Sequence, residues 1–145
     1  MRIFAIAASA VALAALSGCA GSSDTAAPAT KPAPTGAALA GGEWAVFEIN
    51  GAPIVADSKP TIEFKDGRVF GAGSCNRFMG GYTVSPDGVK LQMSQMASTM
   101  MACPDPLMQQ EGAFLKTLGD VTGYSVAGNV LTLTTAGGQT VKARR

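Results

Sequence analysis

The sequence predicts an α+β domain, in which an antiparallel sheet of about eight short strands curls around or against one α-helix near residues 105–118. Three observations support this prediction. Short runs of alternating apolar and polar residues recur from Gly41 to Arg145, two-residue turn signals separate several of them, and one segment has helical periodicity instead.

The first strand is expected to begin at Trp44, after a stretch rich in alanine and glycine. Alternation along a strand places Trp44 and Val46 on one face. The opposite face would then hold Ala45, Phe47 and Ile49.

Two later hairpins have a register that can be predicted from their turns. Asp66-Gly67 is a strong signal for a two-residue hairpin loop, and Gly128-Asn129 is a second one. Each turn keeps apolar residues on one face of its hairpin. The expected cross-strand partners are Phe64 with Val69, Val126 with Leu131, and Tyr124 with Leu133.

The helix is predicted from its boundaries and from its apolar face. Asp105 can cap the helix, Pro106 suits the first helical position, and Gly119 suits its end. One face is apolar except for Glu111. The other members of that face are Leu107, Phe114, Leu115 and Leu118.

The N-terminus predicts export and a lipid anchor. Arg2 precedes a short apolar run that ends in Leu16-Ser17-Gly18-Cys19, which describes a secretory signal rather than a membrane span. These four residues resemble the bacterial lipobox, in which the cysteine is acylated after cleavage. An ordinary signal peptide with a chance cysteine is the alternative. Ala20 then favours an outer-membrane location facing the periplasm.

Three segments follow from this interpretation. Residues 1–18 form the lipoprotein signal peptide, and residues 19–40 carry the lipidated Cys19 and a disordered, proline-containing tether. Residues 41–145 form the folded domain.

Composition excludes several functions. There is no histidine, so Ser-His and Cys-His nucleophile pairs and histidine metal ligation are excluded. Without residues 1–18, ten Lys and Arg balance ten Asp and Glu, so no basic field exists to hold nucleic acid. No spacing of carboxylates identifies a catalytic pair, and we expect neither enzymatic activity nor a cofactor.

Beyond Cys19, the cysteines are Cys75 and Cys103. Because an exported compartment is oxidising, we expect a structural disulfide between them. Two free thiols or a redox-active pair are the alternatives, although no Cys-x-x-Cys motif is present.

The methionines are dense in one segment. Core packing and an adaptable partner surface are two interpretations of such a cluster. The third is Cu(I) binding, because thioethers are soft ligands. The residues concerned are Met93, Met96, Met100 and Met101.

Two segments carry a resemblance to a known family. They are Gly73-Ser74-Cys75-Asn76-Arg77-Phe78-Met79-Gly80-Gly81-Tyr82 and Met96-Ala97-Ser98-Thr99-Met100-Met101-Ala102-Cys103, followed by Glu111 and Phe114. They resemble the META domain family, which includes the heat-shock lipoprotein HslJ. Trp44, Asn50-Gly51 and Leu131-Thr132-Leu133 fit the same family.

The resemblance implies a strongly bent, partly barrel-like antiparallel sheet with one helix. Members are often exported lipoproteins, and some are linked to heat shock or antibiotic tolerance. No enzymatic activity is established for the family. The resemblance therefore favours a non-catalytic binding module in envelope stress or homeostasis, with an envelope protein as partner. A small-ligand or Cu(I)-binding periplasmic protein is the alternative.

The candidate partner-binding residues are Asn76, Arg77 and Phe78, beside the glycine-rich bend. In this interpretation Arg77 is a charged anchor for the partner. A structural role is the alternative, in which Asn76 satisfies backbone groups of a turn and Arg77 pairs with an acid such as Glu111.

Overall fold

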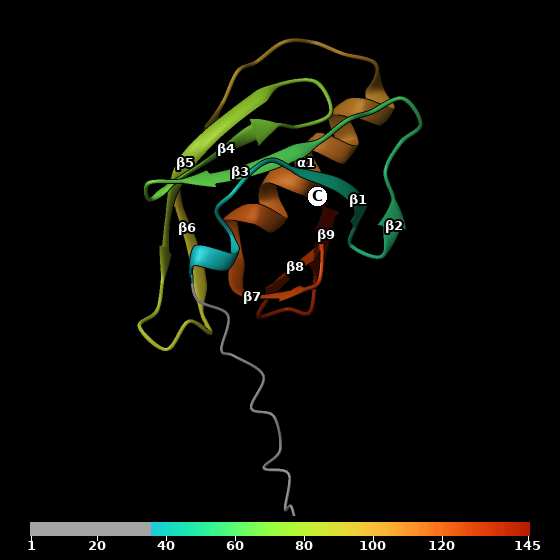
Figure 1. Ribbon diagram of the computed structural model, residues 1–145. Helices are drawn as coiled ribbons and strands as arrows, with labels where there is room; N and C mark the ends of the chain where they lie inside the picture. The colour runs from blue at the N-terminus through green and yellow to red at the C-terminus, as the bar shows by residue number, and fades with distance from the viewer. Residues whose placement is uncertain (1–35) are drawn as a thin grey trace, which may run out of the picture. The chain divides into compact units, whose positions relative to one another are not determined.

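The computed structural model describes residues 36–145, which form an antiparallel nine-stranded sheet and one α-helix (Figure 1). A short 3-10 turn, η1 (Gly36–Ala38), comes first, and helix α1 (Asp105–Gly119) lies between β6 and β7. The strands are β1 (Trp44–Ile49), β2 (Ala52–Pro53), β3 (Thr61–Lys65), β4 (Arg68–Ala72), β5 (Arg77–Val84), β6 (Leu91–Ser98), β7 (Val121–Ala127), β8 (Val130–Thr135) and β9 (Thr140–Arg144).

The sheet is nearly closed into a barrel. Its strand order is β6-β5-β4-β3-β1-β9-β8-β7, and β2 pairs with β1. An isolated bridge between Lys90 and Gly123 brings the β6 and β7 ends together. The predicted α+β class, with a bent sheet and one helix, is confirmed; the sheet has one more strand than expected because β2 contains only two residues.

Helix α1 packs its apolar side into the sheet. Phe114 and Leu118 are fully buried, and the Phe114 ring meets Phe78 of β5 edge to face, with ring centroids 5.6 Å apart. The helix starts at Asp105, the first residue of the predicted range, but Pro104 occupies the capping position, so the prediction that Asp105 caps the helix is wrong. The predicted apolar face is nevertheless the buried face.

The hairpin registers are confirmed. Phe64 pairs with Val69, and both Asp66 and Gly67 have the positive φ angles that a two-residue hairpin turn of this kind requires. In the second hairpin Val126 pairs with Leu131. Tyr124 likewise pairs with Leu133, as predicted.

The prediction for Ile49 is wrong. Val46 pairs with Ala143 but Glu48 pairs with Lys142, so a β-bulge at Phe47 inserts one extra residue into β1. An extra residue reverses the alternation beyond it. Ile49 therefore returns to the buried face instead of sharing the outer face with Phe47.

The folded domain also begins before the predicted boundary at residue 41. Leu39 is fully buried, and its carbonyl accepts a hydrogen bond of 3.0 Å from the buried Trp44 indole. Residues 36–40 thus belong to the folded unit rather than to a tether, because Trp44 needs both this acceptor and this apolar cover. The predicted signal peptide and Cys19 lie outside the described residues. Within residues 36–145 no helix is long and apolar enough to span a membrane.

Candidate functional site

The helix places one carboxylate, Glu111, inside the protein. Its residue is 5 % exposed, and it faces the Cys75-Asn76 segment that leads into β5. The backbone N–H groups of Cys75 and Asn76 donate to Oε2 at 2.8 and 2.6 Å, and the Asn76 side-chain amide donates to Oε1 at 2.7 Å. These donors replace the water that the carboxylate loses on burial.

The same donors lower the pKa of Glu111. Burial by itself raises the pKa because it disfavours the charged form, but hydrogen bonds from Asn76 and Cys75 to the carboxylate outweigh it. The pKa of Glu111 therefore lies below its ordinary value, and the group is a buried anion at neutral pH.

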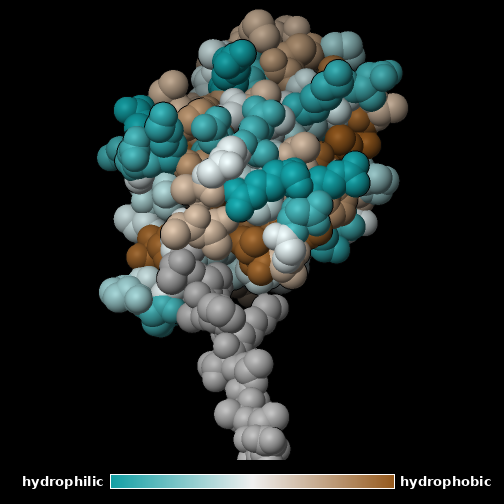
Figure 2. Space-filling view, in the orientation of Figure 1, coloured by the Kyte–Doolittle hydropathy of each residue, from teal (hydrophilic) through white to brown (hydrophobic). Residues whose placement is uncertain are grey.

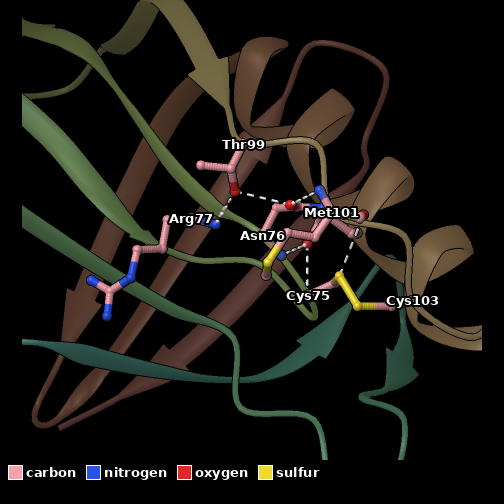
Figure 3. Close-up of a disulfide and its surroundings, with 7 residues drawn as sticks. Cys75, Asn76, Arg77, Thr99, Met101 and Cys103 are labelled. Atoms are coloured by element: carbon pink, nitrogen blue, oxygen red, sulfur yellow. Dashed lines mark hydrogen bonds between the residues drawn. A yellow bond between two sulfur atoms is a disulfide. The ribbon is translucent and has the colours of Figure 1, made fainter.

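Asn76 connects the helix to the chain that follows β6. Its Oδ1 accepts hydrogen bonds from the Thr99 hydroxyl at 2.9 Å and from the Met101 backbone N–H at 2.6 Å. Its Nδ2 donates to the Met101 carbonyl at 3.2 Å as well as to Glu111. The amide thus fills its four hydrogen-bonding positions. We call Asn76, Thr99, Met101 and Glu111 the polar knot, and Figure 3 shows the first three of these residues.

The predicted bridge between Cys75 and Cys103 is present and closes over the polar knot. The two Cα atoms are 6.2 Å apart. The disulfide joins the segment before β5 to the segment before α1, which are the same two segments that Asn76 links by hydrogen bonds. Cys75 Sγ also lies 3.6 Å from the Met101 carbonyl oxygen. This is a contact and not a hydrogen bond, because a disulfide sulfur has no proton to donate.

Of the three candidate partner-binding residues, only Arg77 faces solvent. Asn76 and Phe78 are each 3 % exposed, since β5 begins at Arg77 and side chains alternate along it. The expected ion pair between Arg77 and Glu111 is not formed, because Glu111 faces inward and Arg77 outward. Figure 3 shows the Arg77 side chain extending away from the polar knot.

The four methionines of the Cu(I) hypothesis do not form a single set of ligands, because Met93 is separated from Met100. Met93 is 8 % exposed and belongs to the core, Met96 is half-buried, and Met100 is 96 % exposed. An extended strand rises about 3.3 Å per residue, so Met93 lies roughly 16 Å from the end of β6. Met100 follows that end, and one ion cannot contact both sulfur atoms.

Met100 and Met101 instead lie on the loop between β6 and α1. Figure 2 shows a moderately hydrophobic surface, in tan, at the top of the view, where this loop runs in Figure 1. Met101 is 58 % exposed although its backbone is bonded to Asn76 on both sides.

Some residues of the site had no signal in the sequence. Gln110, next to Glu111, donates to Ser58 Oγ at 3.0 Å and to the Ser74 hydroxyl, and its side-chain oxygen accepts from the Val55 backbone N–H. Its contacts attach the β2–β3 loop to the helix. Nothing in local periodicity distinguishes this glutamine from a solvent-exposed one.

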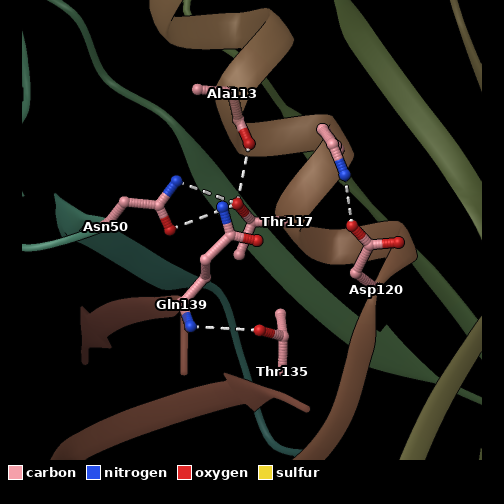
Figure 4. Close-up of polar contacts among 7 residues, drawn as sticks. Asn50, Ala113, Thr117, Asp120, Thr135 and Gln139 are labelled. Carbon is pink, nitrogen blue, oxygen red and sulfur yellow. Dashed lines mark hydrogen bonds and ion pairs between the residues drawn. The ribbon is translucent and has the colours of Figure 1, made fainter. Parts of the chain in front are cut away.

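A second set of polar contacts lies near the other end of α1. Asn50, in the turn after β1, donates from Nδ2 to Thr117 Oγ1 at 3.1 Å, and its Oδ1 lies 3.2 Å from the same hydroxyl (Figure 4). Thr117 is buried and is also 2.8 Å from the Ala113 carbonyl of its own helix.

The pattern of buried asparagine, disulfide and helical glutamate agrees with a known family. Residues 37–145 match the model of the META domain. The chain belongs to the META domain family. This match covers nearly all of the described residues, so the polar knot and the outward-facing Arg77 of this chain lie within its META domain.

Solved structures share this META fold. A protein from Burkholderia xenovorans, determined by NMR, is 24 % identical with a TM-score of 0.61, and the match covers 82 % of this chain and 94 % of that one. A second NMR structure is 25 % identical, with a TM-score of 0.60 and coverage of 74 % and 92 %.

A DUF4847 family protein from Bacteroides vulgatus is 17 % identical, with a TM-score of 0.58 and coverage of 74 % and 94 %. These likenesses show the fold alone. The comparison with curated proteins found no significant match.

Proposed function

We propose that this META domain is a non-catalytic binding module of the bacterial cell envelope, similar to HslJ and acting in envelope stress or homeostasis. Its partner is an envelope protein. The disulfide supports an oxidising compartment, because such bonds persist mainly in exported proteins.

The exposed Arg77 carries this proposal. Its guanidinium forms no ion pair within residues 36–145, whose ion pairs are Lys116–Asp120 and Lys142–Glu48. Its backbone N–H donates to Thr99 Oγ1 at 3.2 Å, so the polar knot fixes the point from which the side chain extends. An unpaired cation on an ordered stretch of backbone is a suitable anchor for a partner, because its N–H donors are available and binding must order only the side chain.

The attachment to the envelope is proposed through a lipid on Cys19, with the domain facing the periplasm from the outer membrane. Several acyl chains on one residue give stable anchoring, at about 0.8 kcal/mol for each buried CH₂. A Cys19→Ala variant is expected to move from the membrane fraction to the soluble fraction. Retention of that variant in the membrane fraction would reject the lipid anchor.

The binding function is tested by crosslinking in living cells, with and without heat stress, followed by mass spectrometry. Wild type is compared with Arg77→Ala and with Lys90→Ala, which removes an exposed cation from a different surface. We expect one recurring envelope protein that disappears only in Arg77→Ala. A partner kept by Arg77→Ala would remove Arg77 from the site, and no partner in wild type under either condition would reject the binding module.

A further inference from the structure

Two hollows lie beside each other on the outer face of the sheet. The first, of about 330 Å³, is bordered by Arg77, Phe70 and Met79 of β4 and β5. The second, of about 350 Å³, is bordered by Phe47 of β1 and Arg144 of β9. Glu43 and Thr61 line both hollows, so the two meet there and form one groove across the strands.

The strand register gives this groove a floor of small side chains. Ala45 pairs with Arg144 on one side and with Thr61 on the other, and Ala72 pairs with Arg77. The Ala72 backbone N–H donates to Thr61 Oγ1 at 3.3 Å, so the pair on β4 and β5 lies next to the residues on β3, β1 and β9. Small residues thus separate two arginines that lie on β9 and β5.

The distance between the two ends follows from the sheet. Four strand spacings separate β9 from β5 in the order β5-β4-β3-β1-β9. Neighbouring strands are about 4.8 Å apart, so the path along the curved sheet between the strands that carry Arg77 and Arg144 is roughly 19 Å.

The charges along the groove are unpaired within the described residues. Both arginines are exposed, and Arg144 lies over the Phe47 ring at 5.6 Å, a contact that leaves its N–H donors available. Glu43 and Glu63 also line the groove without an ion pair to either arginine. Lys59 also lines the second hollow. The groove therefore has an arginine at each end, with two carboxylates and one lysine between them.

We propose that this groove binds an extended peptide segment of a partner protein, with two carboxylates about six residues apart. An extended chain rises about 3.3 Å per residue, so six residues cover the roughly 19 Å between the ends. Each peptide carboxylate pairs with one guanidinium, and Glu43 and Glu63, which outnumber Lys59 between the ends, disfavour any further carboxylate in the middle. This inference rests on the proposed function and names the chemistry of its partner.

The lining favours a peptide over an acidic sugar chain. An acidic sugar chain repeats its carboxylates at short intervals, so some of them would face the two glutamates of the groove. The only hydroxyl side chains of residues 36–145 that line the two hollows are Thr61 and Ser58. Ser58 already donates to the Val55 carbonyl at 2.6 Å and accepts from Gln110. Alanine and the half-buried phenylalanine rings instead suit the backbone and small side chains of a peptide.

The test measures fluorescence anisotropy of labelled nine-residue peptides with the purified full-length protein. The first probe carries two aspartates six residues apart in a serine and threonine background. The second carries them side by side, the third replaces both by lysine, and the fourth is nona-glutamate. We expect the spaced probe to bind at least fivefold more tightly than each of the others. Equal binding of the spaced and adjacent probes, or tighter binding of nona-glutamate, would overturn the proposal.

Matched variants locate the site. Arg77→Ala and Arg144→Ala are each expected to abolish the preference for the spaced probe, whereas Lys90→Ala keeps it. Melting temperatures of all three should equal that of wild type, because each removes an exposed side chain. A preference retained in Arg77→Ala or Arg144→Ala would contradict the groove.

The two proposals can fail separately. A crosslinked partner lost in Arg77→Ala, together with no preference among the peptides, would keep the binding module and reject the peptide groove. A clear preference for the spaced probe without any partner in cells would support the groove chemistry and reject the envelope function.

Discussion

Helix α1 is attached to the sheet at two places that differ in chemistry. Near its N-terminal half, the buried anion Glu111 accepts hydrogen bonds from Asn76 and Cys75, and a disulfide covers the contact. Near its C-terminal half, the neutral hydroxyl of Thr117 meets the amide of Asn50, whose residue is exposed to water.

The difference shows how unequal two polar contacts of one helix can be. Removing a buried carboxylate is costly, because the N–H groups that donated to it then have neither an acceptor nor access to water. An exposed amide that loses its partner can bond to water instead. We therefore expect the two attachments to differ severalfold in their effect on stability.

The largest effect is expected from Glu111→Ala. Three donors lose their acceptor, namely the two backbone N–H groups and the Asn76 amide. At about 1–3 kcal/mol for each buried unsatisfied group, three groups give a fall of about 3–9 kcal/mol in the free energy of unfolding. The lower part of this range, about 3–5 kcal/mol, is expected because the contact of the Cys75 N–H is only part-buried. Urea unfolding monitored by circular dichroism measures this loss.

Glu48→Ala is the control for that experiment. Glu48 pairs with Lys142 at 2.8 Å on a partly exposed strand surface, so we expect a loss within about 1 kcal/mol. Equal losses for the two glutamate variants would show that the polar knot stabilises no more than a surface ion pair.

The lowered pKa of Glu111 also predicts a dependence of stability on pH. Because the folded-state pKa lies below the unfolded value near 4.5, its contribution is complete above that value. It is lost as the pH falls through the folded-state pKa, since the unfolded chain binds the proton more readily. In Glu111→Gln this part of the acid sensitivity should disappear, which urea unfolding at several pH values below 5 can measure. An identical acid profile in that variant would contradict the assignment.

The next largest effect is expected from removing the disulfide. A bridge between residues separated by 28 positions in the sequence stabilises by about 3 kcal/mol in the chain-entropy model. The double variant Cys75→Ser/Cys103→Ser, or reductant with wild type, should lower the melting temperature. Hydrogen exchange at Met101 should remain protected in the variant, because Asn76 still binds its N–H. Loss of that protection would show that the disulfide, and not the asparagine, holds the loop.

A smaller effect is expected at the second attachment. Thr117→Val keeps the shape of the side chain and removes the hydroxyl that contacts Asn50. Water can replace the lost partner of Asn50, so the free energy of unfolding should fall by only about 1 kcal/mol. A loss as large as that of Glu111→Ala would remove the contrast between the two ends of the helix.

The smallest effect on stability is expected from Arg77→Ala. The side chain is exposed and unpaired within the described residues, so the change in unfolding free energy should stay within about 0.5 kcal/mol. Unfolding measured beside wild type checks this. A larger loss would mean that Arg77 has a structural role, and crosslinking results for this variant would then not report on binding.

The sequence alone determined the features that depend on neighbouring residues. The turn at Asp66-Gly67 sets the register of its hairpin, because the turn type and the period of two act over a few residues. Helix periodicity likewise placed Glu111 on the buried face. The cysteine pair was predicted on other grounds, from the oxidising compartment, and the two motif segments from their resemblance to a family.

Only the tertiary structure decided the features that depend on distant parts of the chain. The bulge at Phe47 arises from pairing with β9, almost a hundred residues away, and it returns Ile49 to the core. Asn76 rather than Arg77 meets Glu111, because the start of β5 turns Asn76 inward and Arg77 outward. Which donors reach a buried carboxylate is set by how the strands and the helix pack together, and local sequence patterns contain no record of that packing.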